Sequence, residues 1–86
     1  MTIFSQRLKE LRIENGKTQK EIAAALNTTD DSIFSWEKGR SEPDIETIKK
    51  ICLLFDVTSD YIIGLENEDG TKKRKTIINT INIIQN

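Results

Sequence analysis

Residues 18–39 read TQKEIAAALNTTDDSIFSWEKG, and this stretch decides how the chain folds. Thr18 and Glu21 have the spacing of a capping box, in which the threonine oxygen accepts a hydrogen bond from a helical N–H and the glutamate reaches back. The alanine-rich run that follows favours a helix, and Asn27 favours a turn after it. Thr29 is a suitable N-cap for a second helix, which the final lysine–glycine pair of the stretch closes. The stretch therefore predicts two short helices joined by a tight turn.

The flanking sequence predicts three further helices, over residues 3–14, 45–55 and 59–63. Apolar residues recur at helical spacing in the first of them, and Asp44 and Thr58 can cap the other two. The stripe expected to face the core from the helix over 45–55 consists of Ile45, Ile48, Ile51, Cys52 and Phe55. Five helices with short connections predict an all-α bundle.

The composition restricts the possible functions. The chain has 86 residues, of which 36% are apolar and 31% charged, values typical of one small globular domain. A single cysteine excludes an intramolecular disulfide, and the lack of histidine excludes Ser-His and Cys-His catalytic pairs and His-based zinc sites. No apolar run is long enough to cross a membrane. We therefore expect a cytoplasmic protein that is not an enzyme, with no metal, cofactor, membrane partner or evident small-molecule ligand.

A change in composition divides the chain. Residues 1–65 carry nine basic and eleven acidic residues, a net charge of −2, whereas residues 66–86 carry four basic and three acidic residues, a net charge of +1. We predict a helical domain over residues 1–65, a linker over 66–75 that is first polar and then basic, and an isoleucine-rich tail over 76–86.

The two ends of this C-terminal part leave alternatives open. The basic cluster at residues 72–75 could contact phosphates or a membrane surface, or simply keep the tail in solution. The tail places Ile77, Ile78, Ile81 and Ile84 along one side of a helix, although its isoleucines also suit a strand. So many isoleucines are expected to be buried from solvent, either against the domain itself or against a second chain. We favour the second chain, and predict that these four isoleucines form a dimerisation segment.

The opening stretch, followed by Glu42-Pro43 and by residues 57–62 with the sequence VTSDYI, resembles the phage Cro/repressor-type helix-turn-helix family, also called the xenobiotic response element (XRE) family. The resemblance covers about residues 3–65. It rests on a TQxExA helix, a Trp-Glu-x-Gly helix end and a downstream proline that occur together at the family's spacing. It implies a five-helix lambda-repressor-like DNA-binding domain with a short C-terminal extension. It also implies that the helix over residues 30–38 lies in the major groove of double-stranded DNA.

This recognition helix is expected to have one buried and one free side. Ile33 and Trp36 must point into the core, which leaves five candidates for reading base edges. These are Asp30, Asp31, Ser32, Phe34 and Ser35. The serines could bond to bases or phosphates, and Phe34 could contact a thymine methyl group. The candidates for phosphate contacts are Lys17, Thr18, Gln19, Lys20, Thr29, Lys38 and Arg40. The alternative is that the lysines only solvate the surface and that Phe34 is exposed without a function.

Two acidic features have different interpretations. Asp30 and Asp31 stabilise the start of a helix through its dipole, but they repel phosphates, so they predict weak binding to random DNA. They can also accept a hydrogen bond from a cytosine amino group. The family commonly joins an arginine of its first helix to a glutamate near the end of its third, so the resemblance implies an ion pair between Arg12 and Glu37. Three residues that could carry chemistry are expected to belong to the core instead: Trp36, Tyr61 and Cys52.

The residues and the resemblance together predict a sequence-specific DNA-binding transcriptional regulator. We expect a repressor that binds an inverted-repeat operator in double-stranded DNA as a homodimer. Two alternatives keep the domain and change the function. One is the DNA-binding antitoxin of a toxin–antitoxin pair, whose tail caps the toxin. The other is a protein-interaction adaptor that has lost DNA binding, which the acidic balance of residues 1–65 favours slightly.

Overall fold

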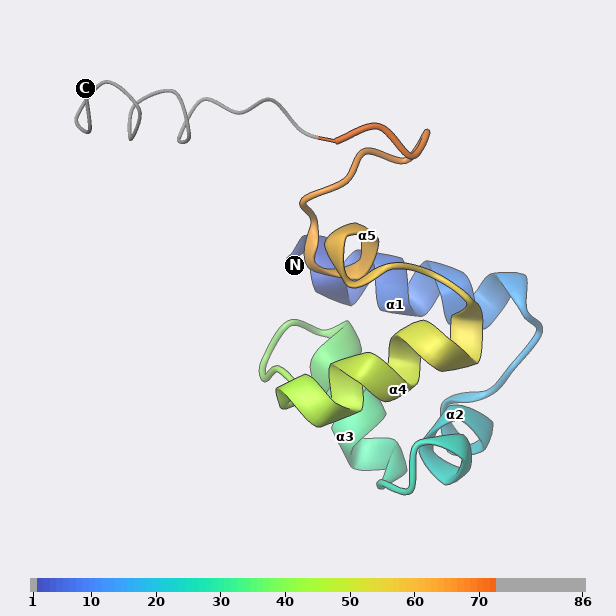
Figure 1. The fold of residues 1–86 in the computed structure, drawn as a ribbon. Helices are drawn as coiled ribbons and strands as arrows, with labels where there is room; N and C mark the ends of the chain where they lie inside the picture. The colour runs from blue at the N-terminus through green and yellow to red at the C-terminus, as the bar shows by residue number, and fades with distance from the viewer. Residues whose placement is uncertain (1, 73–86) are drawn as a thin grey trace.

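The computed structural model describes residues 2–72, which fold into five α-helices around one core (Figure 1). The helices are α1 (Ile3–Glu14), α2 (Gln19–Ala25), α3 (Asp30–Glu37), α4 (Ile45–Phe55) and α5 (Ser59–Ile63). The predicted all-α, five-helix class is confirmed for this part of the chain. The predicted dimerisation residues lie outside the described residues: Ile77, Ile78, Ile81 and Ile84.

Each helix begins where a short polar side chain caps it. The capping side chain accepts a hydrogen bond from the backbone N–H three residues further on. The caps are Thr2, Thr18, Thr29, Asp44 and Thr58. The capping box predicted for α2 is complete, because Glu21 also accepts a hydrogen bond from the Thr18 N–H at 2.9 Å. The end of α3 comes one residue earlier than predicted, since Lys38 is its C-cap.

The turn between α2 and α3 depends on Asn27, as predicted. Its φ of 56° lies in the left-handed region, which asparagine tolerates better than most residues other than glycine. The N–H groups of Asn27 and Thr28 donate to the carbonyl oxygens of Ala24 and Ala23 at 3.2 and 2.9 Å. The chain therefore reverses within a few residues, and α3 packs across α2.

The core draws apolar side chains from all five helices. Its buried members are Phe4, Leu8, Leu11, Ile22, Ala23, Leu26, Ile33, Trp36, Ile51 and Ile62. Ile48, Cys52 and Phe55 of α4 pack against them, as predicted. The prediction for Ile45 is wrong, because its side chain is 77% exposed. Ile45 is the first residue of α4, and helical spacing buries a side chain only where another element covers that turn of the helix.

Part of the predicted linker, residues 66–72, folds as a turn attached to the domain. Glu66 and Lys72 pair as an antiparallel bridge, and between them the Asn67 N–H donates to the Thr71 carbonyl oxygen at 2.7 Å. Lys72 also forms an ion pair with Asp60 of α5. The first residue of the predicted basic cluster is therefore part of the folded domain. The turn over residues 66–72 lies on the side of the molecule away from α2 and α3 (Figure 1).

Arg7 of α1 holds this turn in place, and no sequence pattern singled it out. Its buried guanidinium donates hydrogen bonds to the carbonyl oxygens of Tyr61 and Glu66, the second at 2.8 Å. The same group lies 4.2 Å from the centroid of the Tyr61 ring, a cation–π contact. Because a buried cation needs such partners, Arg7 ties α1, α5 and the turn together.

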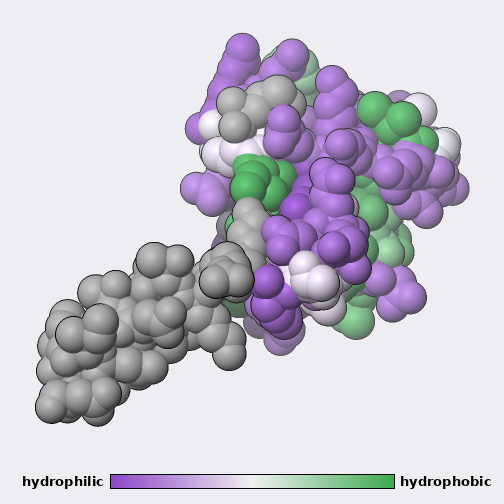
Figure 2. All heavy atoms as spheres, turned by 90° about the horizontal axis from the view of Figure 1, so that it is seen from above, coloured by the Kyte–Doolittle hydropathy of each residue, from purple (hydrophilic) through white to green (hydrophobic). Residues whose placement is uncertain are grey.

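The surface on the α5 side is mainly hydrophilic, with separated apolar groups (Figure 2). Among residues 2–72, no helix combines the length and the apolar character needed to cross a bilayer. Within the same range, no cluster of three or more cysteine and carboxylate side chains could hold a metal ion.

Candidate nucleic-acid interface

The buried side of α3 fixes the position of this helix. Ile33 is fully buried, Trp36 is buried beside it as predicted, and Glu37 is only 3% exposed. Residues three and four apart share a face of a helix, so these three side chains turn one side of α3 toward α1 and α2. The opposite side is left to solvent.

The free side of α3 carries Asp30, Asp31 and Phe34, all of which are exposed. The Phe34 side chain is 40% exposed, which is unusual for an aromatic ring with no partner in the core. Asp30 lies one turn before Phe34 and shares its side of the helix. Because an α-helix fits the major groove of B-DNA, this face has the shape needed to meet base edges.

The two serines predicted to read bases are already hydrogen-bonded within the chain. Ser32 Oγ lies 3.0 Å from Thr29 Oγ1, and Ser35 Oγ lies 2.8 Å from Ser41 Oγ. Both serines are half-buried. Each hydroxyl pair uses one of its two protons internally, so it offers fewer hydrogen bonds to a ligand than the sequence alone indicates.

Glu37 connects three elements beneath this surface. Its carboxylate accepts hydrogen bonds from Arg12 Nε at 2.6 Å and Nη2 at 3.0 Å, so the ion pair that the resemblance implies is present. Gln19 Nε2 donates to the same carboxylate at 3.1 Å, and Arg12 Nη1 donates to the Lys17 carbonyl oxygen at 3.0 Å. The hydrogen bond to Glu37 raises the pKa of Arg12. This network fixes the start of α2 against the end of α3.

Several residues that were predicted to contact phosphates form hydrogen bonds that stabilise the fold. Gln19 already gives one amide hydrogen to Glu37. Thr29 Oγ1 caps α3 by accepting from the Ser32 N–H at 3.2 Å. In the capping box, the hydrogen bonds from the Thr18 backbone and side chain lower the pKa of Glu21. The remaining predicted contacts have no carboxylate within ion-pair distance among residues 2–72: Lys17, Lys20, Lys38 and Arg40.

Two of these free cations lie close to the exposed aromatic ring. Lys38 Nζ and Arg40 Cζ are each 5.5 Å from the centroid of Phe34, within the range of a cation–π interaction. Both follow α3 directly in the sequence. Positive charge is therefore concentrated at the end of α3, whereas its start carries two carboxylates.

A cleft of about 290 Å³ lies beside the same ring, between α1, α2 and α3. Its lining consists of Lys9, Arg12, Gln19, Phe34, Glu37 and Lys38. The sequence pattern did not single out Lys9, although its position one turn before Arg12 on α1 could have identified it. Arg12 and Gln19 already bond to the Glu37 carboxylate in this cleft, so the two lysines give it a net positive charge, which suits an anion such as a phosphate oxygen.

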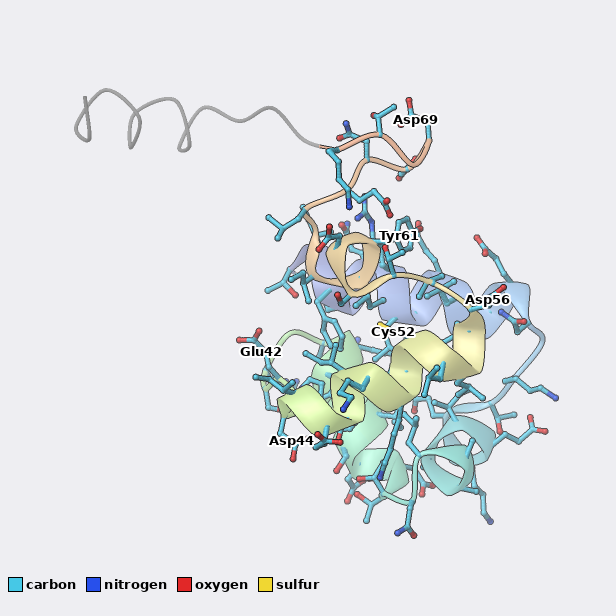
Figure 3. All side chains as sticks on the ribbon, in the orientation of Figure 1. Glu42, Asp44, Cys52, Asp56, Tyr61 and Asp69 are labelled. Atoms are coloured by element: carbon cyan, nitrogen blue, oxygen red, sulfur yellow. The ribbon has the colours of Figure 1, made fainter. Side chains whose placement is uncertain are left out.

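Away from α3, the chemically interesting side chains belong to the fold. Tyr61 and Cys52 pack against the core, as predicted. Cys52 lies on the side of α4 that faces α1 (Figure 3), and burial raises the pKa of its thiol, which disfavours the reactive thiolate. Asp69 lies at the tip of the turn that follows α5, well away from α2 and α3 (Figure 3). The candidate interface is therefore the surface of α3 with the cations around it.

Comparison with known proteins identifies relatives of this chain. The sequence profile of the helix-turn-helix family matches residues 8–62. The chain is 37% identical over 73 residues to the HTH-type transcriptional regulator ImmR of Bacillus subtilis, a match that covers 85% of this chain and 56% of ImmR. It is 25% identical over 79 residues to the cryptic phage CTXphi transcriptional repressor RstR of Vibrio cholerae, covering 92% of this chain and 71% of RstR. The chain thus spans little more than half the length of ImmR.

A solved structure has the same arrangement of helices. The P22 c2 repressor protein, crystallised in complex with a synthetic operator, superposes with a TM-score of 0.70. The superposition covers 74% of this chain and 97% of that chain, at 17% sequence identity. The likeness confirms the predicted lambda-repressor-like fold.

Proposed function

Because the chain belongs to the helix-turn-helix family of the phage Cro/repressor (XRE) type, we propose that it is a sequence-specific DNA-binding transcriptional regulator. Its partner is double-stranded DNA in the cytoplasm, and its activity is occupancy of a site rather than catalysis. In this proposal α3 lies in the major groove, and the cations around it contact the phosphate backbone.

One observation carries this proposal, namely the difference between the two sides of α3. Ile33, Trp36 and Glu37 anchor the helix from within, while Asp30 and Phe34 face solvent with no partner in the core. A helix that is held firmly on one side and free on the other can enter a groove without loss of its own packing. The free side is therefore the proposed reading surface.

The proposed phosphate contacts gather at the end of α3. Lys38 and Arg40 follow the helix, and the Glu37 network brings the start of α2, with Lys17 and Lys20, to the same end. Cations in these positions would set the register of the helix in the groove, because phosphate contacts fix orientation without reading sequence. We add Lys9 to this group, since it lines the same cleft as Lys38.

We further propose that the protein is a repressor that binds an inverted repeat as a homodimer. The name of RstR as a phage repressor supports the first part. Two copies of α3 would have to lie about 34 Å apart to enter successive turns of the major groove on one face of DNA. The proposed dimerisation residues are Ile77, Ile78, Ile81 and Ile84.

The proposal is tested by selecting bound sequences from random duplex DNA and footprinting the protein on the selected sites. A sequence-specific regulator should yield a short consensus with two symmetric halves. The logarithm of its affinity should fall linearly with the logarithm of salt concentration, because cations of the protein displace counterions from DNA. Failure to enrich any sequence, together with no salt dependence, would contradict DNA binding.

The dimer is tested separately by removing residues 73–86. This deletion keeps Lys72 and its ion pair with Asp60, so residues 2–72 retain the contacts described above. The full chain should sediment as a dimer and the truncated chain as a monomer. A truncated chain that keeps the dimer mass would reject the tail as the dimerisation segment while leaving the DNA-binding proposal intact.

A protein-interaction adaptor is the second candidate function, favoured by Asp30 and Asp31 at the start of α3. These carboxylates are exposed, and a surface that approaches DNA would be expected to avoid them. An adaptor should co-purify with a protein partner and show neither a selected DNA sequence nor a salt slope. The DNA-selection experiment therefore separates the two candidates.

A further inference from the structure

We infer that α3 distinguishes bases mainly through the ring of Phe34, which takes the methyl group of a thymine in the major groove. This inference rests on the proposed function and names the chemical group that the interface recognises. The sequence alone names Phe34, two serines and two aspartates as candidates, and their exposure and hydrogen bonds in the structure distinguish them.

The serines are weak candidates because their hydroxyl groups have partners in the chain. Ser32 is bonded to Thr29 at 3.0 Å and Ser35 to Ser41 at 2.8 Å, and both serines are half-buried. A base edge would have to compete for these hydroxyls or share them. A side chain that gives up one internal hydrogen bond for another gains little discrimination between bases.

The aspartates can read only a subset of base edges. An ionised carboxylate accepts hydrogen bonds and donates none, so Asp30 and Asp31 could meet amino groups but not the acceptor atoms of guanine or thymine. Each contact would also bring a negative charge between two rows of phosphates. Their contribution to affinity is therefore small or unfavourable.

Phe34 combines the exposure that the two serines lack with the apolar character that the two aspartates lack. The residue is 40% exposed, and the thymine methyl group is the apolar feature that the major groove offers to an aromatic ring. Lys38 and Arg40 each lie 5.5 Å from the ring centroid, so phosphate contacts by these cations would bring the ring to the groove beside them. The two cations proposed to contact phosphates and the ring proposed to contact the base therefore lie in one cluster.

The decisive experiment changes the DNA and leaves the protein intact. Once a binding site has been selected, each thymine in it is replaced in turn by uracil, which removes one methyl group and alters no hydrogen-bonding atom of the base. We expect one thymine position in each half-site to lose about fourfold in affinity per methyl group, the effect of burying one such group. Replacement at the other thymines should change the affinity by less than about twofold.

A protein variant then assigns the effect to one residue. In Phe34→Ala the affinities for the thymine and the uracil site should become equal, whereas Ser32→Ala and Ser35→Ala should keep the fourfold difference. Thermal unfolding followed by circular dichroism checks that each variant is folded. Phe34 is exposed, so its replacement is expected to leave the fold in place.

The outcomes separate this inference from the proposal on which it rests. Specific binding that is unaffected by uracil at every position would overturn the role of Phe34 and leave the regulator proposal standing. A uracil effect that persists in Phe34→Ala would also overturn it. If no sequence is selected at all, the proposed function fails, and this inference fails with it.

Discussion

The buried and the free sides of α3 meet different physical demands. On the buried side, Ile33 is enclosed by the core and the Glu37 carboxylate accepts three hydrogen bonds from Arg12 and Gln19. On the free side, Asp30 and Phe34 face solvent. A change on the buried side should therefore lower the stability of the domain, whereas a change on the free side should alter what it binds.

The largest expected effect is the loss of stability in Ile33→Ala. The residue is fully buried, so truncation leaves a cavity in the core and should lower the free energy of unfolding by about 4 kcal/mol. Phe34→Ala, one position further along the same helix, should lower the free energy of unfolding by less than about 1 kcal/mol. Urea unfolding followed by circular dichroism measures both. Equal losses for the two variants would show that the two sides of α3 do not differ as described.

Glu37→Ala should have the second-largest effect and lower the free energy of unfolding by about 3 kcal/mol. The reason is electrostatic rather than steric, because Arg12 would keep a partly buried charge and lose its partner. The double variant Arg12→Met with Glu37→Leu should recover part of the loss, since an apolar pair can replace a buried ion pair. Asp31→Ala on the free side is the control, with an expected change within about 0.5 kcal/mol. A double variant less stable than Glu37→Ala would contradict this account.

The division between the two sides of α3 could be predicted from the sequence because it depends on local features. A cap at Thr29 sets the start of the helix, and the spacing of Ile33 and Trp36 then decides which side is buried. Asn27 marks the turn because few residues other than glycine accept its backbone conformation. Each of these features can be read within about ten residues.

The features that the sequence did not reveal depend on distant partners. Arg7 bonds to carbonyl oxygens of residues 61 and 66, and no pattern in α1 indicates which carbonyls will lie beside it. Ser35 finds Ser41 only because the chain turns back after α3. The exposure of Ile45 has a related cause, since periodicity gives the side of a helix that can be buried but not where the core ends. Tertiary contacts decide all three.

On the free side, Lys38→Met should weaken binding to DNA by about tenfold at low salt. The variant removes one proposed phosphate contact, so the slope of log affinity against log salt should decrease by about 1. Lys49→Met is a matched control, because Lys49 is an exposed lysine of α4 paired with Glu46 at 3.4 Å. Fluorescence anisotropy over a range of salt concentrations measures both variants. An equal change in slope for Lys49→Met would mean that the effect reflects net charge rather than a contact near α3.

The smallest expected effect is that of Asp31→Asn, which should raise affinity for random duplex DNA by about threefold to fivefold at low salt. Asparagine keeps the size of the side chain and removes a negative charge that, in the proposed complex, would face the phosphates. The gain should disappear at high salt, where charges more than a few ångströms apart no longer interact. Glu46→Gln on α4 removes the same charge from an exposed position on another helix and should leave the affinity unchanged. If Asp31→Asn and Glu46→Gln behave alike, the free side of α3 does not approach DNA, and the difference between its two sides would reflect folding alone.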